Sequence, residues 1–154
     1  MSRPIVNKIM STKSLLETMQ RVHSHVAYAR ELGMQVLEAS RESTLVLMPP
    51  NAAALSGDTV RGWLATGVTT ALIDSACGVA LHAHLGAPEQ IATIDLRVDY
   101  LRPARADLAL YCRAECFRLT RSIAFMRAAA YQDDPAAPVA TASGGFMRLS
   151  AAAP

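Results

Sequence analysis

The sequence has little charge, few aromatic residues and no long run of one charge sign. Charged residues make up 18% of its 154 residues, aromatic residues make up 5%, and the net charge is +2. No basic run interleaved with aromatics occurs, so we expect no nucleic-acid partner. Half of the chain is hydrophobic, and a chain of this length can bury a large core without disulfides or metal. We therefore predict a single globular domain over residues 1–154.

Cysteine and histidine patterns typical of redox and metal sites are also missing. The three cysteines are odd in number, lack a C-x-x-C spacing and are expected to be buried free thiols: Cys77, Cys112 and Cys116. His82 and His84 lack two further ligands that could complete a metal site. We expect no metal and no cofactor. There is also no G-x-S-x-G motif, and Ser75 has no evident histidine partner, which disfavours a serine hydrolase.

Membrane and export signals are weak. Residues 1–20 mix charged and apolar residues without a continuous apolar segment, so we expect no signal peptide and a cytoplasmic location. Residues 62–85 are nearly long enough to span a membrane, but they contain Asp74, His82 and His84. A buried helix of a protein with no membrane partner is the expected interpretation.

Hydrophobic periodicity predicts two helices and six strands. The N-terminal helix is expected over about 13–32, with Ser11, Thr12 or Ser14 as its N-cap and Gly33 as its stop. The other expected elements are a hairpin of 34–39 and 43–48, a loop over 51–61, a central helix over about 65–83, strands at 91–101, 108–118, 121–132 and 139–149, and a frayed tail at 150–154.

The order of these elements predicts the fold. A run of antiparallel strands needs a cover for its apolar face, and the central helix is the one helix that is long and apolar enough. In the strand at 91–101, alternation places Ile94 and Tyr100 on an apolar face and Thr93 on a polar one. The expected architecture is α+β, with a curved antiparallel sheet wrapped around one long helix, which is the layout of a hotdog fold.

The central helix carries one carboxylate, Asp74, in an otherwise apolar sequence. Burial of an ionised carboxylate costs several kcal/mol unless the group is paired, and perturbed carboxylates are often catalytic. Asp74 shares a helical stripe with Gly67, Ala71, Ser75 and Gly78, whose small side chains are typical of a pocket wall. The alternative is a structural ion pair, for which the sequence offers three arginines: Arg61, Arg97 and Arg102.

Residues 62–78 resemble the motif G-x-x-H-G-G-x-x-x-x-L-x-D-x-A-x-G of PaaI-like hotdog acyl-CoA thioesterases. Residues 92–104 are similar to the strand motif T-x-D-L-x-x-x-Y-L-R-P-A of that family, and residues 139–146 resemble its closing strand. The likeness extends over about residues 24–149. The combination of motifs is specific, although each alone would be weak.

This resemblance implies catalytic roles for four residues. Asp74 matches the carboxylate that activates water or attacks the thioester directly. Thr66 and Gly67 match the Gly-Gly at the helix start, where a backbone N–H polarises the thioester carbonyl. Thr93 matches a Ser/Thr position that orients the attacking water. The site of such dimers lies between protomers, which implies that Asp74 of one chain faces the Thr93 region of another.

The sequence also departs from the family pattern. The usual histidine before the Gly-Gly is Ala65 here, and the position that often carries an asparagine is Thr59. Their loss removes side chains that orient the carbonyl and the loop. The expected substrate-binding residues are Thr59, Ala65, Ala71, Ser75, Gly78 and Arg102, the last as a cation for the phosphates of coenzyme A.

The predicted function is hydrolysis of an aromatic or medium-chain acyl-CoA by a homodimer or a dimer of dimers. A minimal set for this reaction is a carbonyl polariser and a carboxylate. Two alternatives stay open. One is an acyl-CoA-binding module without turnover, which the missing histidine and asparagine favour, and the other is a purely structural oligomer with Asp74 in an ion pair.

Overall fold

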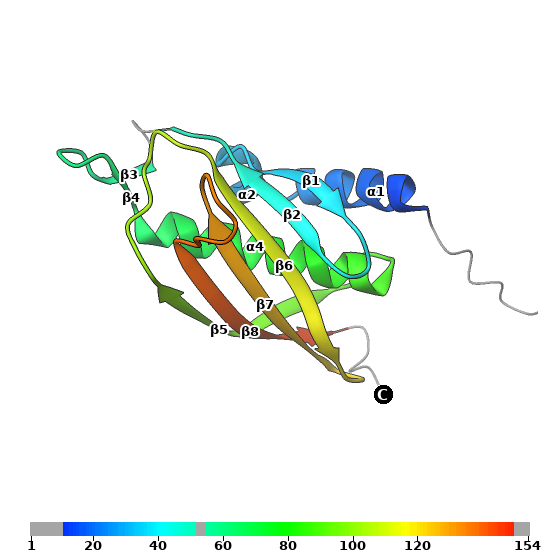
Figure 1. The fold of residues 1–154 in the computed structure, drawn as a ribbon. Helices are drawn as coiled ribbons and strands as arrows, with labels where there is room; N and C mark the ends of the chain where they lie inside the picture. Colours follow the sequence, from blue (N-terminus) through cyan, green and yellow to red (C-terminus); the bar gives the residue numbers. More distant parts are fainter. Residues whose placement is uncertain (1–10, 52–54, 150–154) are drawn as a thin grey trace, which may run out of the picture.

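The computed structural model describes residues 11–51 and 55–149 (Figure 1). The expected frayed tail at 150–154 lies outside the described residues. The elements in chain order are α1 (Thr12–Ser24), α2 (Ala27–Glu31), β1 (Gln35–Ala39), β2 (Thr44–Met48), β3 (Ser56–Asp58), β4 (Trp63–Leu64), α4 (Thr66–Leu85), β5 (Ile91–Tyr100), β6 (Leu110–Leu119), β7 (Ile123–Tyr131) and β8 (Ala140–Arg148).

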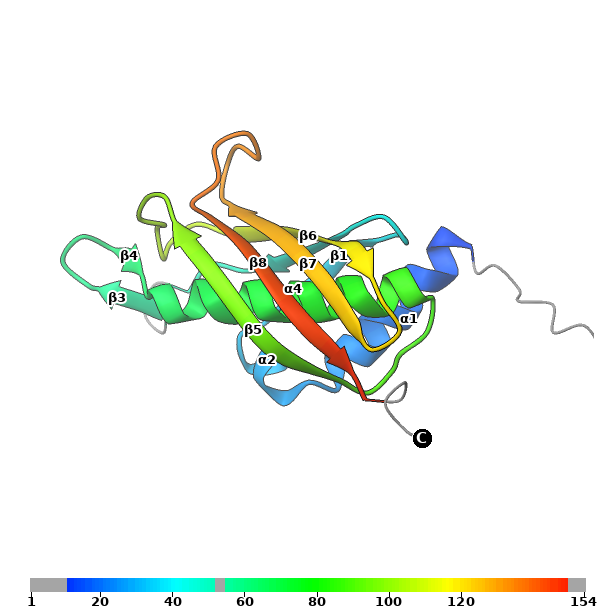
Figure 2. The same cartoon turned by 90° about the horizontal axis from the view of Figure 1, so that it is seen from below.

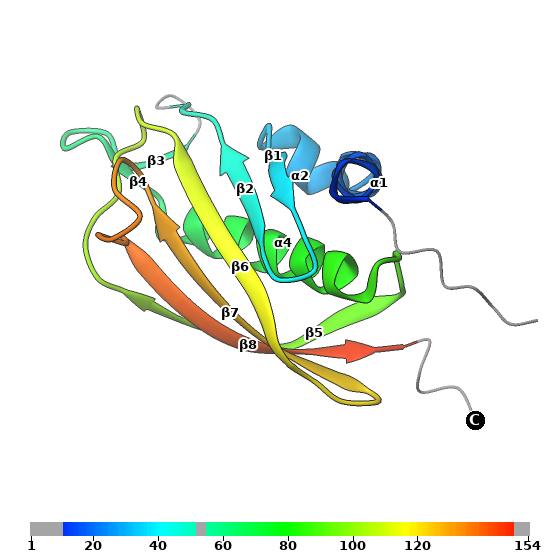
Figure 3. The ribbon, with the colours of Figure 1, turned by 45° about the vertical axis from the view of Figure 1, so that its right-hand side comes forward.

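The main sheet has six strands in the order β1-β2-β6-β7-β8-β5, and each neighbouring pair is antiparallel. It curves around α4, which lies along its concave side (Figure 3). Helix α1 packs beside β1, while β5 forms the opposite edge of the sheet (Figure 2). The predicted α+β architecture, a curved sheet around one helix, is confirmed.

Helix α4 is the centre of the hydrophobic core. Its sequence is almost free of charge, and Leu72, Ile73 and Leu81 have no exposed surface. Gly86 ends the helix in the left-handed conformation at φ 77°, where glycine carries no steric penalty. The helix runs over 66–85 rather than the predicted 65–83. Within the described residues, no helix combines the length and hydropathy needed to cross a bilayer.

The predicted N-terminal helix at 13–32 is instead two helices. Ser11 caps α1 by accepting a hydrogen bond from the Ser14 N–H at 3.2 Å, as predicted. The break falls at Val26, whose backbone is extended, and α2 then turns back so that Ala29 packs into the core. Neither glycine nor proline marks this break, so the periodicity alone could not locate it. Gly33, at φ 67°, follows α2 as expected.

Two smaller differences concern strands. The predicted loop at 51–61 contains β3, which pairs with β4 in a separate two-stranded sheet. Strand β5 has a bulge between Thr93 and Asp95 where it pairs with β8. A bulge shifts the inward–outward alternation by one residue. Strict alternation along β5 was therefore a wrong expectation, and this shift determines where Thr93 lies.

Candidate functional site

A cavity of about 340 Å³ lies along α4, between the helices α1 and α2 and the start of β5. Most of the predicted small-residue stripe of α4 lines it, namely Ala71, Asp74, Ser75 and Gly78, whereas Gly67 does not. Gly78 is open enough that an added Cβ would be 3.7 Å from Ile91 Cδ1, its nearest neighbour. Small side chains here therefore leave space beside the Asp74 carboxylate instead of filling it.

Asp74 is held by one hydrogen bond from the neighbouring strand. The Thr93 hydroxyl donates to Asp74 Oδ1 at 2.9 Å, and both residues line the cavity. Asp74 is half-buried, while Thr93 is exposed. Among the described residues no arginine pairs with Asp74, because Arg61 and Arg97 form ion pairs with other aspartates. The ion-pair interpretation of Asp74 therefore has no support in this structure.

The β-bulge explains how Thr93 reaches Asp74. Leu96 and Val98 pack against the core, and the Tyr100 hydroxyl donates to a backbone oxygen of α4. Without the bulge, the Thr93 side chain would lie on the opposite face of the sheet from these residues. The bulge places it on the helix side as well.

Two glycines of β8 make room for this bulge. A Cβ on Gly144 would lie 2.7 Å from the Asp95 carbonyl oxygen, and a Cβ on Gly145 would lie 2.7 Å from Asp95 Oδ1. A Cβ does not approach a backbone oxygen so closely, so the bulge requires glycine at position 144, whereas the atom next to Gly145 is the end of an exposed side chain that can rotate away. The Asp74–Thr93 contact thus depends on residues from three elements.

The resemblance implied that Asp74 faces the Thr93 region of another protomer, whereas the structure brings together Asp74 and Thr93 of one chain. The reason is that β5 crosses the cavity side of α4 in the same chain, and its bulge turns Thr93 toward the helix. This part of the expectation is corrected. The contact forms without a second copy of the chain.

The start of α4 lies apart from Asp74. Gly67 precedes Asp74 by seven residues, which corresponds to about 10 Å along a helix axis. One carbonyl oxygen cannot contact both groups of the same chain at that separation. Thr66 and Gly67 are exposed, and Thr66 lines a separate depression with Trp63 and Arg102.

Tyr100 fixes this first turn of α4. Its hydroxyl donates to the Thr66 carbonyl oxygen at 2.9 Å and is within hydrogen-bond distance of the Thr70 hydroxyl. Ala65 is the N-cap and provides no side-chain hydrogen bond. The end of β5 therefore holds the first turn of α4 through a backbone carbonyl oxygen, while no side chain caps the N–H groups of this turn.

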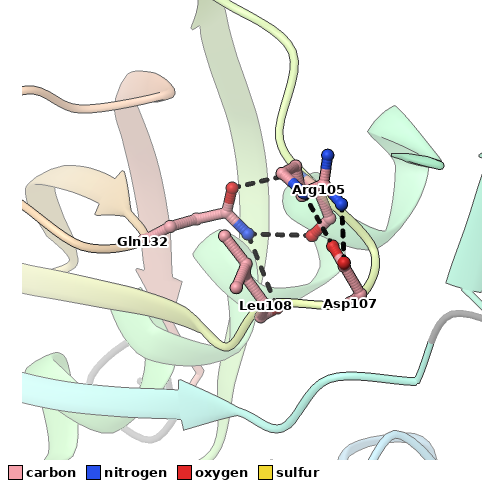
Figure 4. Close-up of polar contacts among 4 residues, drawn as sticks. All are labelled: Arg105, Asp107, Leu108 and Gln132. Atoms are coloured by element: carbon pink, nitrogen blue, oxygen red, sulfur yellow. Dashed lines mark hydrogen bonds and ion pairs between the residues drawn. The ribbon is translucent and has the colours of Figure 1, made fainter. Parts of the chain in front are cut away.

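Arg102 belongs to the loop between β5 and β6, near the helix start. Gln132 braces this loop, because its amide accepts from the Arg105 N–H at 2.9 Å and donates to the Arg105 carbonyl at 2.8 Å (Figure 4). Arg105 also pairs with Asp107 at 2.6 Å. The exposed Arg102 side chain therefore belongs to a loop held by several hydrogen bonds, and it lines the same depression as Thr66.

The remaining predicted binding residues lie away from the cavity. Thr59 is exposed in the tight turn between β3 and β4, where the Asp58 carboxylate accepts from the N–H groups of Val60 and Arg61. Ala65 is half-buried at the start of α4. Neither residue lines the cavity that contains Asp74.

The structure adds a histidine that the sequence analysis did not select. His23 of α1 lies 2.8 Å from the Ser75 hydroxyl through its Nε2, although 52 residues separate them. Burial lowers the pKa of His23 below its ordinary value of 6.5, so the ring is neutral near pH 7. Ser75 therefore has a histidine partner after all. No local motif indicated it, because only the packing of α1 on α4 creates the contact.

The other titratable candidates have structural surroundings. All three cysteines are buried and free, and burial together with the Asp74 charge raises the pKa of Cys77 to about 12. His82 and His84 bond the backbone oxygens of Glu89 and Arg41. No group of three or more metal-ligating side chains occurs in the described part of the chain.

Comparisons with known proteins match the segment that contains this cavity's Asp74 and Thr93. The sequence profile described as the Thioesterase superfamily matches residues 62–139, which contain all of α4 and β5. A solved structure of a protein from Pseudomonas aeruginosa is 36% identical with a TM-score of 0.79, and the match covers 88% of this chain and 99% of that one. Both Asp74 and Thr93 thus lie in the segment that the profile matches.

Two further relatives are more distant or partial. The Escherichia coli PaaI protein from the phenylacetic acid degradation operon is 18% identical with a TM-score of 0.77, over 90% of this chain and 95% of that one. At this identity the likeness concerns the fold alone, which is the hotdog fold. A Halobacterium salinarum protein named "Putative esterase" is 38% identical over 79 residues, which are 50% of this chain and 52% of that protein. The match to this curated relative spans about half of its length.

Proposed function

Because the chain belongs to the thioesterase superfamily, we propose that it hydrolyses the thioester of an acyl-CoA to a free acid and coenzyme A. The observation that carries the proposal is the Asp74 carboxylate, which lines a cavity and accepts a hydrogen bond from Thr93 at 2.9 Å. The cavity of about 340 Å³ suits an aromatic or medium-chain acyl group.

Asp74 supplies the carboxylate that the reaction needs. One oxygen accepts the Thr93 hydrogen bond, and the other is available to take a proton from water or to attack the thioester carbon. In the first route the water oxygen adds to the carbonyl carbon, the C–S bond breaks, and the proton taken by Asp74 passes to the sulfur, which leaves as coenzyme A thiol. In the second route the Asp74 oxygen forms an acyl anhydride as the C–S bond breaks and the thiolate leaves, and a water then hydrolyses this anhydride to the free acid, restores Asp74 and supplies the proton of the thiol. Thr93 fixes the carboxylate, and it is also placed to orient the water.

A second copy of the chain completes the site in this proposal. The first-turn N–H groups at Thr66 and Gly67 are about 10 Å from Asp74 along α4, so one chain cannot offer both to one thioester. Strand β5 is an edge strand of ten residues with Ile94 half exposed, and such an edge is suited to pair with a second copy. A homodimer through β5 brings the helix start of the partner toward Asp74. Arg102 near that start then contacts the phosphates of coenzyme A.

The test is release of free thiol from a panel of aromatic and aliphatic acyl-CoAs by the wild type and by Asp74→Asn. Removal of a general base lowers kcat by about 10² to 10⁴-fold, so the near-isosteric variant should lose nearly all turnover. Asp133→Asn is the matched control, because Asp133 is an exposed carboxylate in the loop between β7 and β8 and does not line the cavity. It should keep full activity.

Two results would contradict the proposal. Full activity in Asp74→Asn would remove the carboxylate from the mechanism. Absence of turnover in the wild type, with acyl-CoA still raising the melting temperature, would instead identify an acyl-CoA-binding module. The unpaired, buried thiols agree with a reducing compartment, and we propose a cytoplasmic location.

A further inference from the structure

The cavity beside Asp74 contains a second polar contact that the proposed hydrolysis does not use. His23 of α1 and Ser75 of α4 lie 2.8 Å apart through Nε2 and Oγ, and both line the cavity. The His23 side chain is 5% exposed, and Ser75 is half-buried. A polar pair in this position requires an explanation, because it faces the space that the acyl group would occupy.

Apart from the phenol of Tyr28, which also lines the cavity, the wall that α1, α2 and the following segment form around this pair is apolar. Helices α1 and α2 and the segment after them contribute these lining residues: Met19, Val22, Val26, Ala29 and Met34. A simple alkyl chain packed against the pair would cover a serine hydroxyl and an imidazole without giving either a new partner. Since the two groups already bond each other, the cost of covering them lies in the hydrogen-bonding positions that this contact leaves unused and that water would otherwise fill. An acyl group with its own polar atom at this point would be preferred.

The pair is uncharged, which limits the type of group it can bind. Burial keeps His23 neutral near pH 7, so one ring nitrogen donates and the other accepts, and the Ser75 hydroxyl can do both. A second carboxylate on the substrate would meet no cation here and would be repelled by Asp74 on the adjacent position. His82 lines the same cavity, but its Nε2 contacts the Glu89 carbonyl oxygen at 3.0 Å. A neutral hydroxyl fits these surroundings.

The position of the pair also limits where that hydroxyl sits. Asp74 and Ser75 are consecutive in α4, and their side chains reach toward β5 and α1 respectively. A thioester carbonyl beside Asp74 therefore places the first few acyl carbons next to Ser75. We propose that the His23–Ser75 pair binds a hydroxyl on these carbons, so that hydroxyacyl-CoAs are the preferred substrates. This inference rests on the proposed function for the identity of the cavity as the acyl site.

The test compares acyl-CoAs that differ only by one hydroxyl: hexanoyl-CoA against 3-hydroxyhexanoyl-CoA, and 3-phenylpropanoyl-CoA against 3-hydroxy-3-phenylpropanoyl-CoA. The wild type should show a kcat/KM ratio of about tenfold or more in favour of the hydroxylated member of at least one pair. Ser75→Ala and Ser75→Ala/His23→Leu should bring this ratio close to one. The readout is the ratio within each pair of substrates, because a general loss of activity lowers both members alike and leaves the ratio unchanged.

The matched controls are Ser24→Ala and His25→Leu on the exposed side of α1, where both side chains contact the Arg21 carbonyl oxygen. They should keep the wild-type ratio. A wild-type ratio near one, or a ratio unchanged in Ser75→Ala, would overturn the inference. If the wild type turns over no acyl-CoA, the same pairs are compared as non-hydrolysable thioether analogues by calorimetry. A hydroxyl preference that Ser75→Ala removes would then uphold the binding role while the hydrolase proposal fails, and equal affinities would overturn both.

Discussion

The side chains around Asp74 make different contacts and are expected to have different roles. Thr93 donates to one carboxylate oxygen, Cys77 lies buried one turn further along α4, and Ser75 points away toward His23. A carboxylate with a single donor keeps one oxygen available for water or for a substrate carbon. Changes to these neighbours should therefore alter the reaction in different ways.

Thr93→Val should remove the donor and keep the shape of the side chain. Hydrogen bonds to charged groups contribute about 1.5–3 kcal/mol, so kcat/KM for the best acyl-CoA should fall by roughly tenfold or more. The measurement is steady-state thiol release. Thr141 lies on the neighbouring strand β8 and does not itself line the cavity, so Thr141→Val should retain wild-type activity. Equal activities in the two variants would mean that the Asp74–Thr93 contact has no part in catalysis.

The three thiols should be unreactive in the folded protein. Burial raises the pKa of Cys77 to about 12, and it also raises the pKa of Cys112 and of Cys116. Because the thiolate is the reacting species, alkylation at pH 8 should be slow until the chain unfolds. Mass spectrometry after a short iodoacetamide treatment should find no adduct in native protein and three in denaturant. Rapid native labelling of Cys77 would contradict its buried position.

At the scale of elements, the site depends on glycines of α4 and β8 that leave space for the cavity and for the bulge of β5. Gly78 leaves room on α4, and Gly144 and Gly145 leave room for the β5 bulge that turns Thr93 inward. These glycines have different structural roles. One opens the cavity, and the others permit a backbone conformation.

Alanine at these positions should therefore separate stability from activity. At Gly78, a Cβ would make an ordinary 3.7 Å contact with Ile91, so Gly78→Ala should stabilise the helix by up to about 1 kcal/mol and narrow the cavity. We expect a raised melting temperature and a raised KM. Gly144→Ala should instead destabilise the protein by about 1–3 kcal/mol, because its Cβ would lie 2.7 Å from the Asp95 carbonyl. Denaturant unfolding of both variants measures whether the free energy of unfolding rises for Gly78→Ala and falls for Gly144→Ala. A lower free energy of unfolding for Gly78→Ala would refute the interpretation that Gly78 faces an open cavity.

At the scale of the whole molecule, the buried His23 and the half-buried His82 link stability to pH. Burial lowers the pKa of His23 and of His82, so the unfolded chain binds protons that the folded state resists. Stability should therefore decrease as the pH falls below the unfolded value of 6.5 and continue to decrease until the lowered folded pKa values are reached.

The check is the melting temperature between about pH 5 and 7.5, above the range where carboxylates titrate. The wild type should lose stability toward the acid end of this range, and His23→Leu/His82→Leu should have a flatter profile. His25→Leu, at an exposed position of α1, should keep the wild-type slope. If the melting temperature of the double variant changes with pH as steeply as that of the wild type, groups other than these two histidines cause the acid sensitivity.

The free edge of β5 should govern assembly. Ile94 is 51% exposed on this strand, and a lysine there should prevent edge-to-edge pairing. Light scattering after gel filtration should find a dimer or larger for the wild type and a monomer for Ile94→Lys, with thioesterase activity lost. Val60→Lys changes a residue that is 95% exposed in the β3–β4 turn and should leave both properties intact. A dimeric Ile94→Lys protein would place the interface elsewhere.

The sequence by itself determined the central helix, its small-residue stripe, the six strands of the main sheet and the stop at Gly33, and it limited the first N-cap to Ser11, Thr12 or Ser14. These features are local, since hydrophobic period and backbone preference act over a few residues. The stripe also indicated correctly that Asp74 lines a cavity.

Only the tertiary structure decided the break at Val26, the bulge in β5 and the pairing of His23 with Ser75. Each depends on residues far apart in the chain: Gly144 and Gly145 accommodate the bulge, and α1 meets α4 across 52 residues. Such contacts form because packing selects one arrangement among many that local propensities allow. The same reason explains why the partner of Asp74 was expected in another protomer and is found on the adjacent strand of the same chain.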